Sequence, residues 1–552
     1  MPRRISPHFS LTATTCLVGL AASSAAFGAV GLSPLRFFPG GSPFVGVAPT
    51  TQSVAINSRG DVIVGEEVRT QNGTLVTPTV RFRNGARGPW SQTLALARPT
   101  TDTSEPLVAI NGRGSRIAVF HRAGKYVASR QRPNGWKLSA INAPAPTTED
   151  VTALAVTATG RGRFVHALPD TGCDPDPAIC PWRVWIYDQA TPGSLWVRDG
   201  DSLPIAAAQR PSLSVNSRGD VLVAWATTGA SGRVNAARRL DGEPAFEAAL
   251  PVSSPGVRGD VSAALGSGGD AAIAWVHPDA PGSGTGFTGR IDVAVRGRSL
   301  PVWAAPETAV PAGTPNPDVD LAIDSSANIT LAWTAFPASA GAPLGIDATV
   351  RSSATSTWVP SPRLDSAAVG DGESIELGDV LAGGGRSFVI YEKHLGPGAN
   401  ISRLAVGGPS GWKVNTLAGN VDPTAASSDG PRPVPAVAPN GNVILVGNGM
   451  QVRNFDGART LLAARATGLR VIVTGRSAEM RFRLNTQARI FVLRSSGANF
   501  RTVGQYPAVI LPAGANHLST GRLAVGRYRV GLGVCNRSRG CTATRFVEFR
   551  IR

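Results

Sequence analysis

Residues 211–225 read PSLSVNSRGDVLVAW, and this stretch decides the fold because variants of it recur along the chain. Clear copies are SVAINSRGDVIVGEE (53–67), LVAINGRGSRIAVFH (107–121), DVSAALGSGGDAAIAW (260–275), DVDLAIDSSANITLAW (318–333) and VPAVAPNGNVILVGN (434–448). Two degenerate copies, TALAVTATGRGRFVHA (152–167) and IELGDVLAGGGRSFVIYE (375–392), fill the gaps between them. Eight copies therefore follow one another at intervals of 46 to 59 residues.

Each copy predicts a β-hairpin. A short strand mixes Ser, Ala and Gly with Val, Ile and Leu, and Asn-x-x-Gly follows it, as in Asn216 to Gly219. Asn at the first position of such a turn bonds its own backbone, and Gly at the fourth accepts a positive φ. The turn positions of the eight copies are Gly60, Gly114, Gly160, Gly219, Gly269, Ala327, Gly385 and Gly441.

Two aromatic positions also recur. Six residues after the turn stand Phe120, His166, Trp225, Trp275, Trp333 and Tyr391. A second aromatic opens the last strand of most copies, at Trp90, Trp136, Trp196, Phe246, Trp303, Trp358 and Trp412. Large aromatics at matched places suit the packing of one twisted sheet on the next, and their recurrence favours this role over sugar stacking.

This period is typical of a four-stranded blade, so we predict an all-β chain with a β-propeller of eight blades over residues 30–465. Seven blades would result if the degenerate third copy were an insertion. The last copy lacks its final aromatic, whereas LSPLRFFPG (32–40) precedes the first copy. We predict that this segment supplies the missing outer strand and closes the ring.

The chain ends in a domain of different character. Residues 466–552 contain six or seven strand-like segments, which predict a β-sandwich of the immunoglobulin-like or fibronectin-like kind. They carry 15 Arg and two acidic residues, a net charge of +13 out of +17 for the whole chain. A domain this basic should attract polyanions.

Segment 521–551, GRLAVGRYRVGLGVCNRSRGCTATRFVEFRI, resembles C-terminal modules of secreted actinobacterial proteins, in which L-x-x-G-x-Y precedes a final F-x-I or F-x-V strand. The repeats resemble those of uncharacterised exported β-propeller proteins of high-GC bacteria. The resemblance implies a propeller followed by an immunoglobulin-like or fibronectin-like module, and it implies no activity.

The N-terminus predicts export. Arg3 and Arg4 precede a short apolar run, and small residues follow it, so residues 1–29 read as a signal peptide. We expect a secreted, extracellular or cell-envelope protein, monomeric and with no later transmembrane segment. Four cysteines then form two close pairs that predict disulfides, Cys173 with Cys180 and Cys535 with Cys541.

Candidate binding residues are few. His121, His277 and His394 fall at or just past the second strand of their copies, so they are expected on one propeller face. Together they would suit a metal, although isolated histidines on loop edges are the commoner case. Glu66 and Glu392 are further binding candidates.

An acidic stretch offers a second site. Asp371 and Glu373, with Asp174 and Asp176 near the first cysteine pair, are candidate Ca²⁺ ligands. The alternative is a solvated acidic loop. The sequence predicts no cofactor and offers no catalytic set.

Two functions remain open. In the first, the protein binds without catalysis: propeller loops present a ligand site, and the basic tail contacts an anionic cell-wall polymer or polysaccharide rather than a specific nucleic acid. A generically basic surface without a dedicated partner is the alternative for the tail. In the second, the protein is a carbohydrate-active enzyme, a sialidase-like glycosidase or a lyase. The sialidase box S-x-D-x-G-x-x-W is not matched, because Trp follows the turn at six residues rather than three.

Overall fold

The computed structural model describes two compact units, one within Gly31–Arg459 and one within Thr460–Arg552. Described residues are 36–37 and 50–552 except for 70–74, 86–87, 102–105, 133–134, 146–150, 171–179, 207, 228–230, 280–287, 316–317, 336–343, 361–362, 368–372, 396–399, 409–410, 421–433, 448–450, 456–465, 485–487, 497–500, 506–508, 512–513, 537–539 and 544–546. All regular elements in these ranges are strands, and no helix long and apolar enough to cross a membrane occurs in them. The predicted signal peptide lies outside the described residues.

The first four copies of the repeat each form one antiparallel sheet. Sheet I contains β2 (Thr50–Ile56), β3 (Val62–Arg69), β4 (Val76–Arg83) and β5 (Leu94–Ala95). Sheet II contains β6 (Leu107–Ile110), β7 (Arg116–Arg122), β8 (Lys125–Arg132) and β9 (Gly135–Ile141). Sheet III contains β10 (Val151–Val156), β11 (Gly162–Pro169), β12 (Trp182–Gln189), β13 (Val197–Arg198) and β14 (Leu203–Ile205). Sheet IV contains β15 (Ser212–Val215), β16 (Val221–Ala226), β17 (Val234–Arg239) and β18 (Leu250–Pro251).

The other four copies do the same. Sheet V contains β19 (Arg258–Leu265), β20 (Ala271–Pro278), β21 (Thr288–Arg296) and β22 (Glu307–Pro315). Sheet VI contains β23 (Asp318–Ile323), β24 (Ile329–Ala335), β25 (Leu344–Arg351), β26 (Trp358–Pro360) and β27 (Asp365–Ala367). Sheet VII contains β28 (Glu373–Gly383), β29 (Arg386–Leu395), β30 (Asn400–Gly408) and β31 (Gly411–Asn420). Sheet VIII contains β32 (Val434–Val437), β33 (Val443–Gly447), β34 (Gln451–Phe455) and the N-terminal β1 (Arg36–Phe37).

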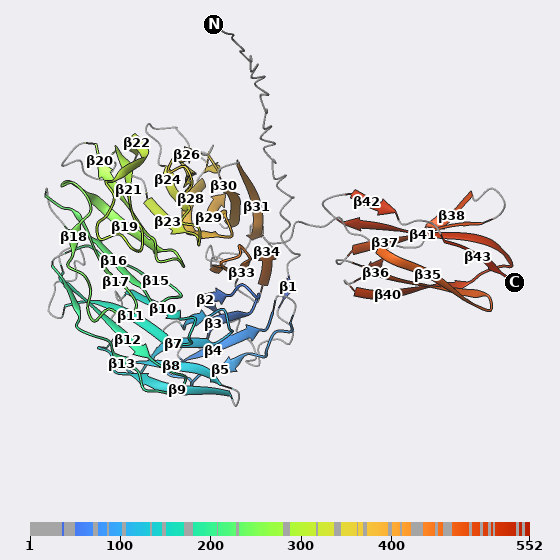
Figure 1. Ribbon diagram of the computed structural model, residues 1–552, viewed down its shortest axis with the longest axis horizontal. Helices are drawn as coiled ribbons and strands as arrows, with labels where there is room; N and C mark the ends of the chain where they lie inside the picture. Colours follow the sequence, from blue (N-terminus) through green and yellow to red (C-terminus); the bar gives the residue numbers. More distant parts are fainter. Residues whose placement is uncertain are drawn as a thin grey trace, which may run out of the picture. The chain divides into compact units, whose positions relative to one another are not determined.

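These sheets are arranged in a ring, the architecture of a β-propeller (Figure 1). The first strand of every sheet contacts the first strand of the next sheet, and β32 of sheet VIII contacts β2 of sheet I. The first strands therefore lie around the axis. The second and third strands of each sheet follow outward in sequence order, and in sheet VIII the N-terminal β1 is the outermost strand.

The predicted hairpin turns are confirmed. All eight turn positions have positive φ, from +60° at Ala327 to +96° at Gly219. In the turn after β15, Asn216 Oδ1 accepts hydrogen bonds from the backbone N–H groups of Arg218 and Asp220. This is the local bonding that favours Asn at the first turn position.

The same asparagines join neighbouring sheets. Asn57 Nδ2 donates to the carbonyl of Asn111 at 2.9 Å, and Asn111 Nδ2 donates to the carbonyl of Thr157 at 2.8 Å. Asn216 Nδ2 donates to the carbonyl of Gly266. Asn440 Nδ2 donates to the carbonyl of Ser58 and so links the last turn to the first. In these four cases the turn that makes the hairpin thus also connects it to the next sheet.

The recurring aromatics lie between sheets. The first set is buried at every position, and Trp275 and His166 are at most 1% exposed. In the second set, Trp196 of sheet III packs with Ile117 of sheet II, and Trp303 of sheet V packs with Leu222 of sheet IV. The packing interpretation is therefore supported.

Ion pairs form a third link between sheets. In three places, an acidic residue follows an aromatic of the second recurring set by a few positions. It pairs with the arginine that ends the third strand of the next sheet. The pairs are Asp199 with Arg239 at 2.8 Å, Glu247 with Arg296 at 2.5 Å and Glu307 with Arg351 at 2.7 Å.

The second unit contains two sheets. The three-stranded sheet contains β35 (Ala466–Thr474), β36 (Ser477–Leu484) and β40 (Gly514–Arg522). The six-stranded sheet contains β37 (Ala488–Ser496), β38 (Arg501–Gln505), β39 (Val509–Leu511), β41 (Gly526–Asn536), β42 (Gly540–Ala543) and β43 (Val547–Ile551).

The two sheets share one apolar core. Ala478 of β36 is buried with Tyr528 of β41 and Ile551 of β43, and Val471 and Phe549 pack against them. The Tyr528 hydroxyl donates to the carbonyl of Ala524 at 2.8 Å. We call this contact, in which a tyrosine bonds back to the backbone just upstream, the Tyr528 corner.

The cysteine pairs are described only in part. Cys535 of β41 stands directly opposite Cys541 of β42 in the strand register, a backbone arrangement compatible with a disulfide. Cys180 is buried, and Cys173 lies outside the described residues. Both disulfides stay predictions.

The predicted ring closure is confirmed. β1 pairs with β34 in antiparallel fashion, with Arg36 opposite Val452 and Phe37 opposite Gln451. The last sheet is thus built from both ends of the propeller segment. Without β1, the edge of β34 would present unpaired backbone groups.

We expect deletion of residues 32–40 to lower the melting temperature of the chain by about 3 °C or more, because an outer strand and its backbone bonds are lost. Differential scanning calorimetry measures the change. A matched control replaces the same nine residues with a Gly/Ser segment that preserves chain length. Melting of the deletion variant at the wild-type temperature would contradict closure by this segment.

Candidate functional site

The candidate histidines lie on separate sheets. His121 lies near the end of β7 beside Tyr126, with the ring centroids 6.1 Å apart. His277 lies near the end of β20 with Nδ1 3.1 Å from the carbonyl of Pro278. His394 lies near the end of β29, opposite Ser374. All three lie near the hairpin that joins the second and third strands of their own sheets. They come from sheets II, V and VII.

The two candidate glutamates are buried. Glu66 pairs with Arg81 through Oε2 and Nε at 3.0 Å, and both side chains are 1% exposed. Burial raises the pKa of Glu66 to about 7 although Arg81 acts against the shift. Glu392 is also buried and accepts a hydrogen bond from Ser402 Oγ. Because buried side chains cannot meet a large ligand, neither residue offers an open binding group.

The described residues contain no group of three His, Cys, Asp or Glu side chains that could hold a metal ion. Of the Ca²⁺ candidates, Asp371, Asp174 and Asp176 lie outside the described residues. Glu373 is described, and its Oε2 lies 3.2 Å from Nζ of Lys393. The Ca²⁺ site stays a prediction.

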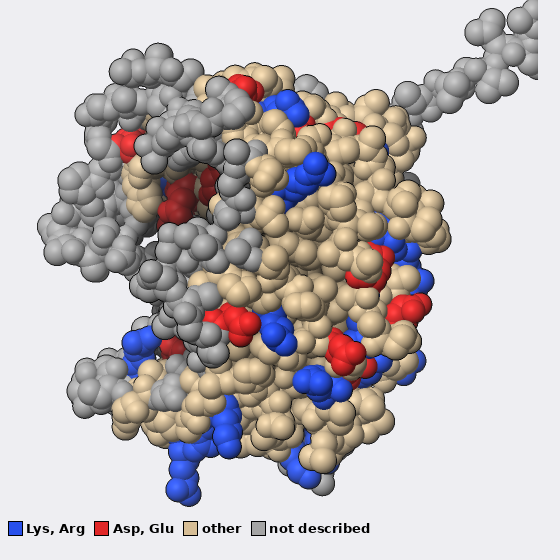
Figure 2. Space-filling model, turned by 90° about the vertical axis from the view of Figure 1, so that its left-hand side faces the viewer, with Lys and Arg blue, Asp and Glu red and all other residues tan. Residues whose placement is uncertain are grey.

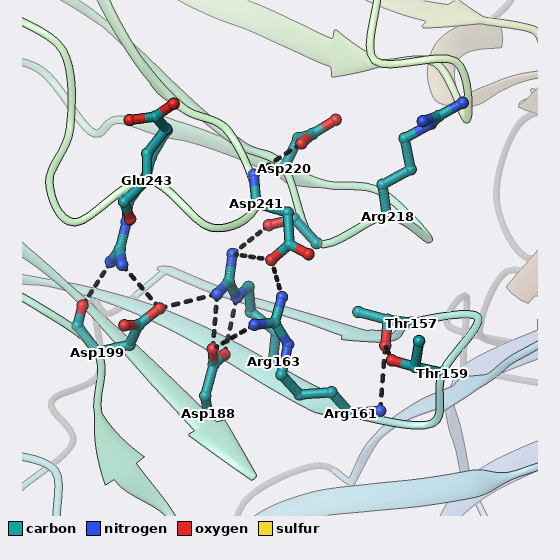
Figure 3. A network of polar contacts seen from close by, with 12 residues as sticks. Thr157, Thr159, Arg161, Arg163, Asp188, Asp199, Arg218, Asp220, Asp241 and Glu243 are labelled. Carbon is teal, nitrogen blue, oxygen red and sulfur yellow. Dashed lines mark hydrogen bonds and ion pairs between the residues drawn. The ribbon is translucent and has the colours of Figure 1, made fainter. Parts of the chain in front are cut away.

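A dense charge network joins sheets III and IV (Figure 3). Arg163, 1% exposed, pairs with Asp188 at 2.6 Å and with Asp199 at 2.8 Å. Arg161 pairs with Asp188 and Asp241. Burial alone would raise the pKa of Asp199, but Arg239 and Arg163 hold it below its usual value.

This network is internally compensated, since three arginines (Arg161, Arg163, Arg239) face three aspartates (Asp188, Asp199, Asp241). The surface in Figure 2 similarly carries basic and acidic side chains interspersed, with some acidic side chains recessed in a hollow. Such matching stabilises the contact between sheets and leaves little net charge for a ligand.

The innermost strands of the eight sheets differ in their acidic residues. Among the eight innermost strands as described, they occur only on β19, β23 and β28, which are neighbours in the ring. The residues are Asp260, Asp318, Asp320, Glu373, Glu376 and Asp379. β28 also has a register shift between Leu377 and Val380, and Asp379 within it is exposed. Bulges of this kind re-aim side chains and are common beside active sites.

Asp320 has the most unusual environment of these acids. Its Oδ1 accepts from Ser262 Oγ at 2.7 Å and from the backbone N–H of Leu321, and its Oδ2 accepts from the backbone N–H of Val380 at 3.0 Å. The carboxylate therefore bridges β19, β23 and β28. Burial raises its pKa to about 6, the hydrogen bonds act against the shift, and the charge of Asp379 adds to it.

The tail presents the opposite charge. On the three-stranded sheet, Arg470 of β35 stands directly opposite Arg481 of β36, which stands opposite His517 of β40. All three residues are exposed. Glu479 lies 3.2 Å from Arg481 and neutralises part of this charge. Like charges directly opposite one another destabilise a sheet, so the row favours an anionic partner.

The sequence alone indicates part of these sites. It predicts the acidic stretch that contains Glu373 and the basic tail. Asp320 was missed, although its place in the first strand of the sixth copy, DVDLAI, was a usable signal: a second acid where other copies have small or apolar residues. The cross-strand row of the tail needed the strand register.

No protein-family model and no curated protein matches this sequence. Among solved structures, a fungal copper alcohol oxidase of the AA5 family is similar over 94% of this chain and 99% of its own, with 10% identity and a TM-score of 0.38. A PL25 ulvan lyase is similar over 75% and 95%, with 8% identity and a TM-score of 0.40. The β-propeller domain of the trilobed protease from Pyrococcus furiosus is similar over 68% and 100%, with 9% identity and a TM-score of 0.39.

We expect Asp320 to make the propeller less stable as the pH rises. A carboxyl whose pKa is raised in the folded state contributes stability at low pH, and this contribution disappears as the pH passes from about 4 through about 6. The change is on the order of 2–3 kcal/mol in the free energy of unfolding.

Urea unfolding of the wild type and of Asp320→Asn between pH 4 and pH 7.5 measures it. Asp320→Asn should lack this decline, and replacement of the exposed Asp201 by Asn should retain it. A decline of equal size in wild type and Asp320→Asn would contradict the assignment.

Proposed function

We propose that the protein is an exported, envelope-associated binding protein whose tail attaches it to an anionic cell-wall polymer. The observation that carries the proposal is the row of Arg470, Arg481 and His517 across the exposed face of the three-stranded sheet. Guanidinium groups bind phosphate and carboxylate oxygens through paired hydrogen bonds, so such a row suits a polymer with repeated negative charges.

The distribution of charge supports this division of roles. The tail carries 13 of the 17 net positive charges, whereas arginines of the propeller are met by acids in pairs such as Arg296 with Glu247. A polyanion gains more from the tail, because only two acidic residues, Glu479 and Glu548, compete there for 15 arginines.

The proposal includes finer features of the architecture. Each of the eight sheets is assigned as one blade, and the tail is assigned as an immunoglobulin-like or fibronectin-like module on the basis of its two-sheet core and the Tyr528 corner. Residues 1–29 are assigned as a signal peptide, and the two cysteine pairs as disulfides that form after export. The propeller is assigned a scaffold or ligand-presenting role.

Retention on isolated cell-wall material tests the function. We expect the full chain to bind at low salt and to elute as salt rises, and the Arg470→Ser/Arg481→Ser variant to bind about tenfold more weakly. Arg198→Ser/Arg233→Ser, which removes two exposed arginines of the propeller, is the matched control and should bind as the wild type does. Equal losses in both variants, or no retention at low salt, would contradict the proposal.

A second candidate function is carbohydrate cleavage at the propeller axis. The observation that favours it is the pair formed by Asp320, with its raised pKa, and the neighbouring exposed Asp379 on the bulge of β28. Two carboxyls in unlike environments can divide the roles of general acid and general base.

Screening of the wild-type chain against neutral and uronic-acid polysaccharides tests this alternative. If the chain cleaves one of them, Asp379→Asn should lower kcat by about 100-fold or more. Asp318→Asn, on the neighbouring innermost strand β23, is the control and should leave kcat unchanged. Cleavage that survives Asp379→Asn would place the reaction elsewhere, and no cleavage by the wild type would leave the binding function alone.

A further inference from the structure

The six-stranded sheet of the tail carries a second row of arginines. Arg527 of β41 stands directly opposite Arg550 of β43, and both are exposed. Beside them, Arg529 pairs with Glu548 at 2.9 Å. The like-charged pair lacks a neighbouring acid of its own among the described side chains of these two strands.

This row and the first one lie on opposite sides of the tail. On β41 the side chains alternate, and Tyr528 and Val530 are buried where Arg527 and Arg529 are not. On β36 the same alternation buries Ala478, Met480 and Phe482 and exposes Arg481 and Arg483. Because Tyr528 and Ala478 meet in the core between the sheets, the arginines of each sheet point away from that core.

The two outer faces are similar in charge. The described side chains of the first face include Arg470, Arg481 and Arg483 with Glu479, and those of the second include Arg527, Arg529 and Arg550 with Glu548. Each face thus combines three arginines with one glutamate. Both carry a like-charged pair in directly opposite register, which is unfavourable until an anion lies between the two groups.

We propose that the tail is bivalent: it binds one segment of an anionic polymer on each outer face and so bridges two polymer strands. The inference rests on the proposed polyanion-binding function and adds a second site to it. The ligand we expect is a linear polymer with repeated phosphate or carboxylate groups, because guanidinium groups donate hydrogen bonds to the oxygens of both.

Bivalence has a physical consequence that single-site binding does not have. A single face can coat a polymer, whereas two opposite faces join polymer chains into a network whose size is greatest at an intermediate ratio of protein to polymer. A protein with this property would cross-link the polymer that holds it.

Light scattering of the full chain mixed with long-chain polyphosphate or with hyaluronate tests the inference. We expect a scattering maximum at an intermediate protein-to-polymer ratio with at least one of the two polymers. Phosphate and carboxylate are thereby compared as the preferred charge. Sedimentation velocity without polymer checks that the chain itself is monomeric, since a dimer with one face each would also bridge.

Two face variants separate binding from bridging. Arg470→Ser/Arg481→Ser and Arg527→Ser/Arg550→Ser each remove two charges from one face, and each should still bind the polymer, roughly tenfold more weakly, with the scattering maximum lost. The propeller control Arg198→Ser/Arg233→Ser should retain both. Circular dichroism and melting temperature show that the variants are folded.

The outcomes distinguish a failure of bivalence from a failure of the proposed polyanion-binding function. Loss of scattering in both face variants with binding retained supports bivalence. Loss of binding in the first variant, with the second binding and scattering as the wild type does, would leave one site and overturn bivalence while the proposed function stands. Scattering that persists in both variants, or scattering by a dimer, would also overturn it. Unchanged binding in both variants would remove the proposed function itself.

Discussion

The fold depends on a hairpin turn whose fourth residue has positive φ and whose backbone is pressed against a neighbouring sheet. A Cβ added at Gly114 would come within 2.4 Å of Arg59 Nη2, and one at Gly219 within 2.9 Å of Arg161 Nη2. Glycine at these positions meets the demand of the left-handed backbone, whereas the nearby arginine side chains are flexible at their ends and can move aside. Because the asparagine of the same turn donates to the next sheet, four residues set both the shape of a sheet and its attachment to the ring.

Features that recur from copy to copy could be predicted from the sequence, whereas contacts between residues far apart in the sequence could not. The turn and the first aromatic stand at a fixed offset in each copy, and the second aromatic recurs before the last strand of most copies. The closing strand follows from the absence of that aromatic in the last copy, so a comparison of copies is enough to find all of these features. The ion pairs between sheets join residues 40 to 49 positions apart, and the acid follows its aromatic by a different number of residues each time, as Asp199, Glu247 and Glu307 show. The sequence indicates that His121, His277 and His394 lie near the ends of their strands. It does not give the distances between these three side chains, because they belong to different sheets.

The chain handles charge in two contrasting ways. In the propeller, arginines such as Arg163 are buried and matched by aspartates, so that no buried charge of this network is left without a partner of opposite sign. In the tail, arginines lie on the outer faces with few acids near them, an arrangement that weakens the isolated domain slightly and favours association with anions. The acids at the axis form a third group, concentrated on three neighbouring strands, where they distinguish one side of the ring from the other.

The pairing of β1 with β34 has a consequence for the order of events during synthesis. The two strands are separated by more than 400 residues of sequence, so the ring cannot close until nearly the entire propeller has left the ribosome. Sheets I to VII have their own hairpins and can assemble progressively, but sheet VIII must wait for both partners. Completion of the fold is thereby coupled to completion of synthesis, and a chain truncated before Gln451 would keep an unsealed ring that is open to proteolysis and to strand exchange with another copy.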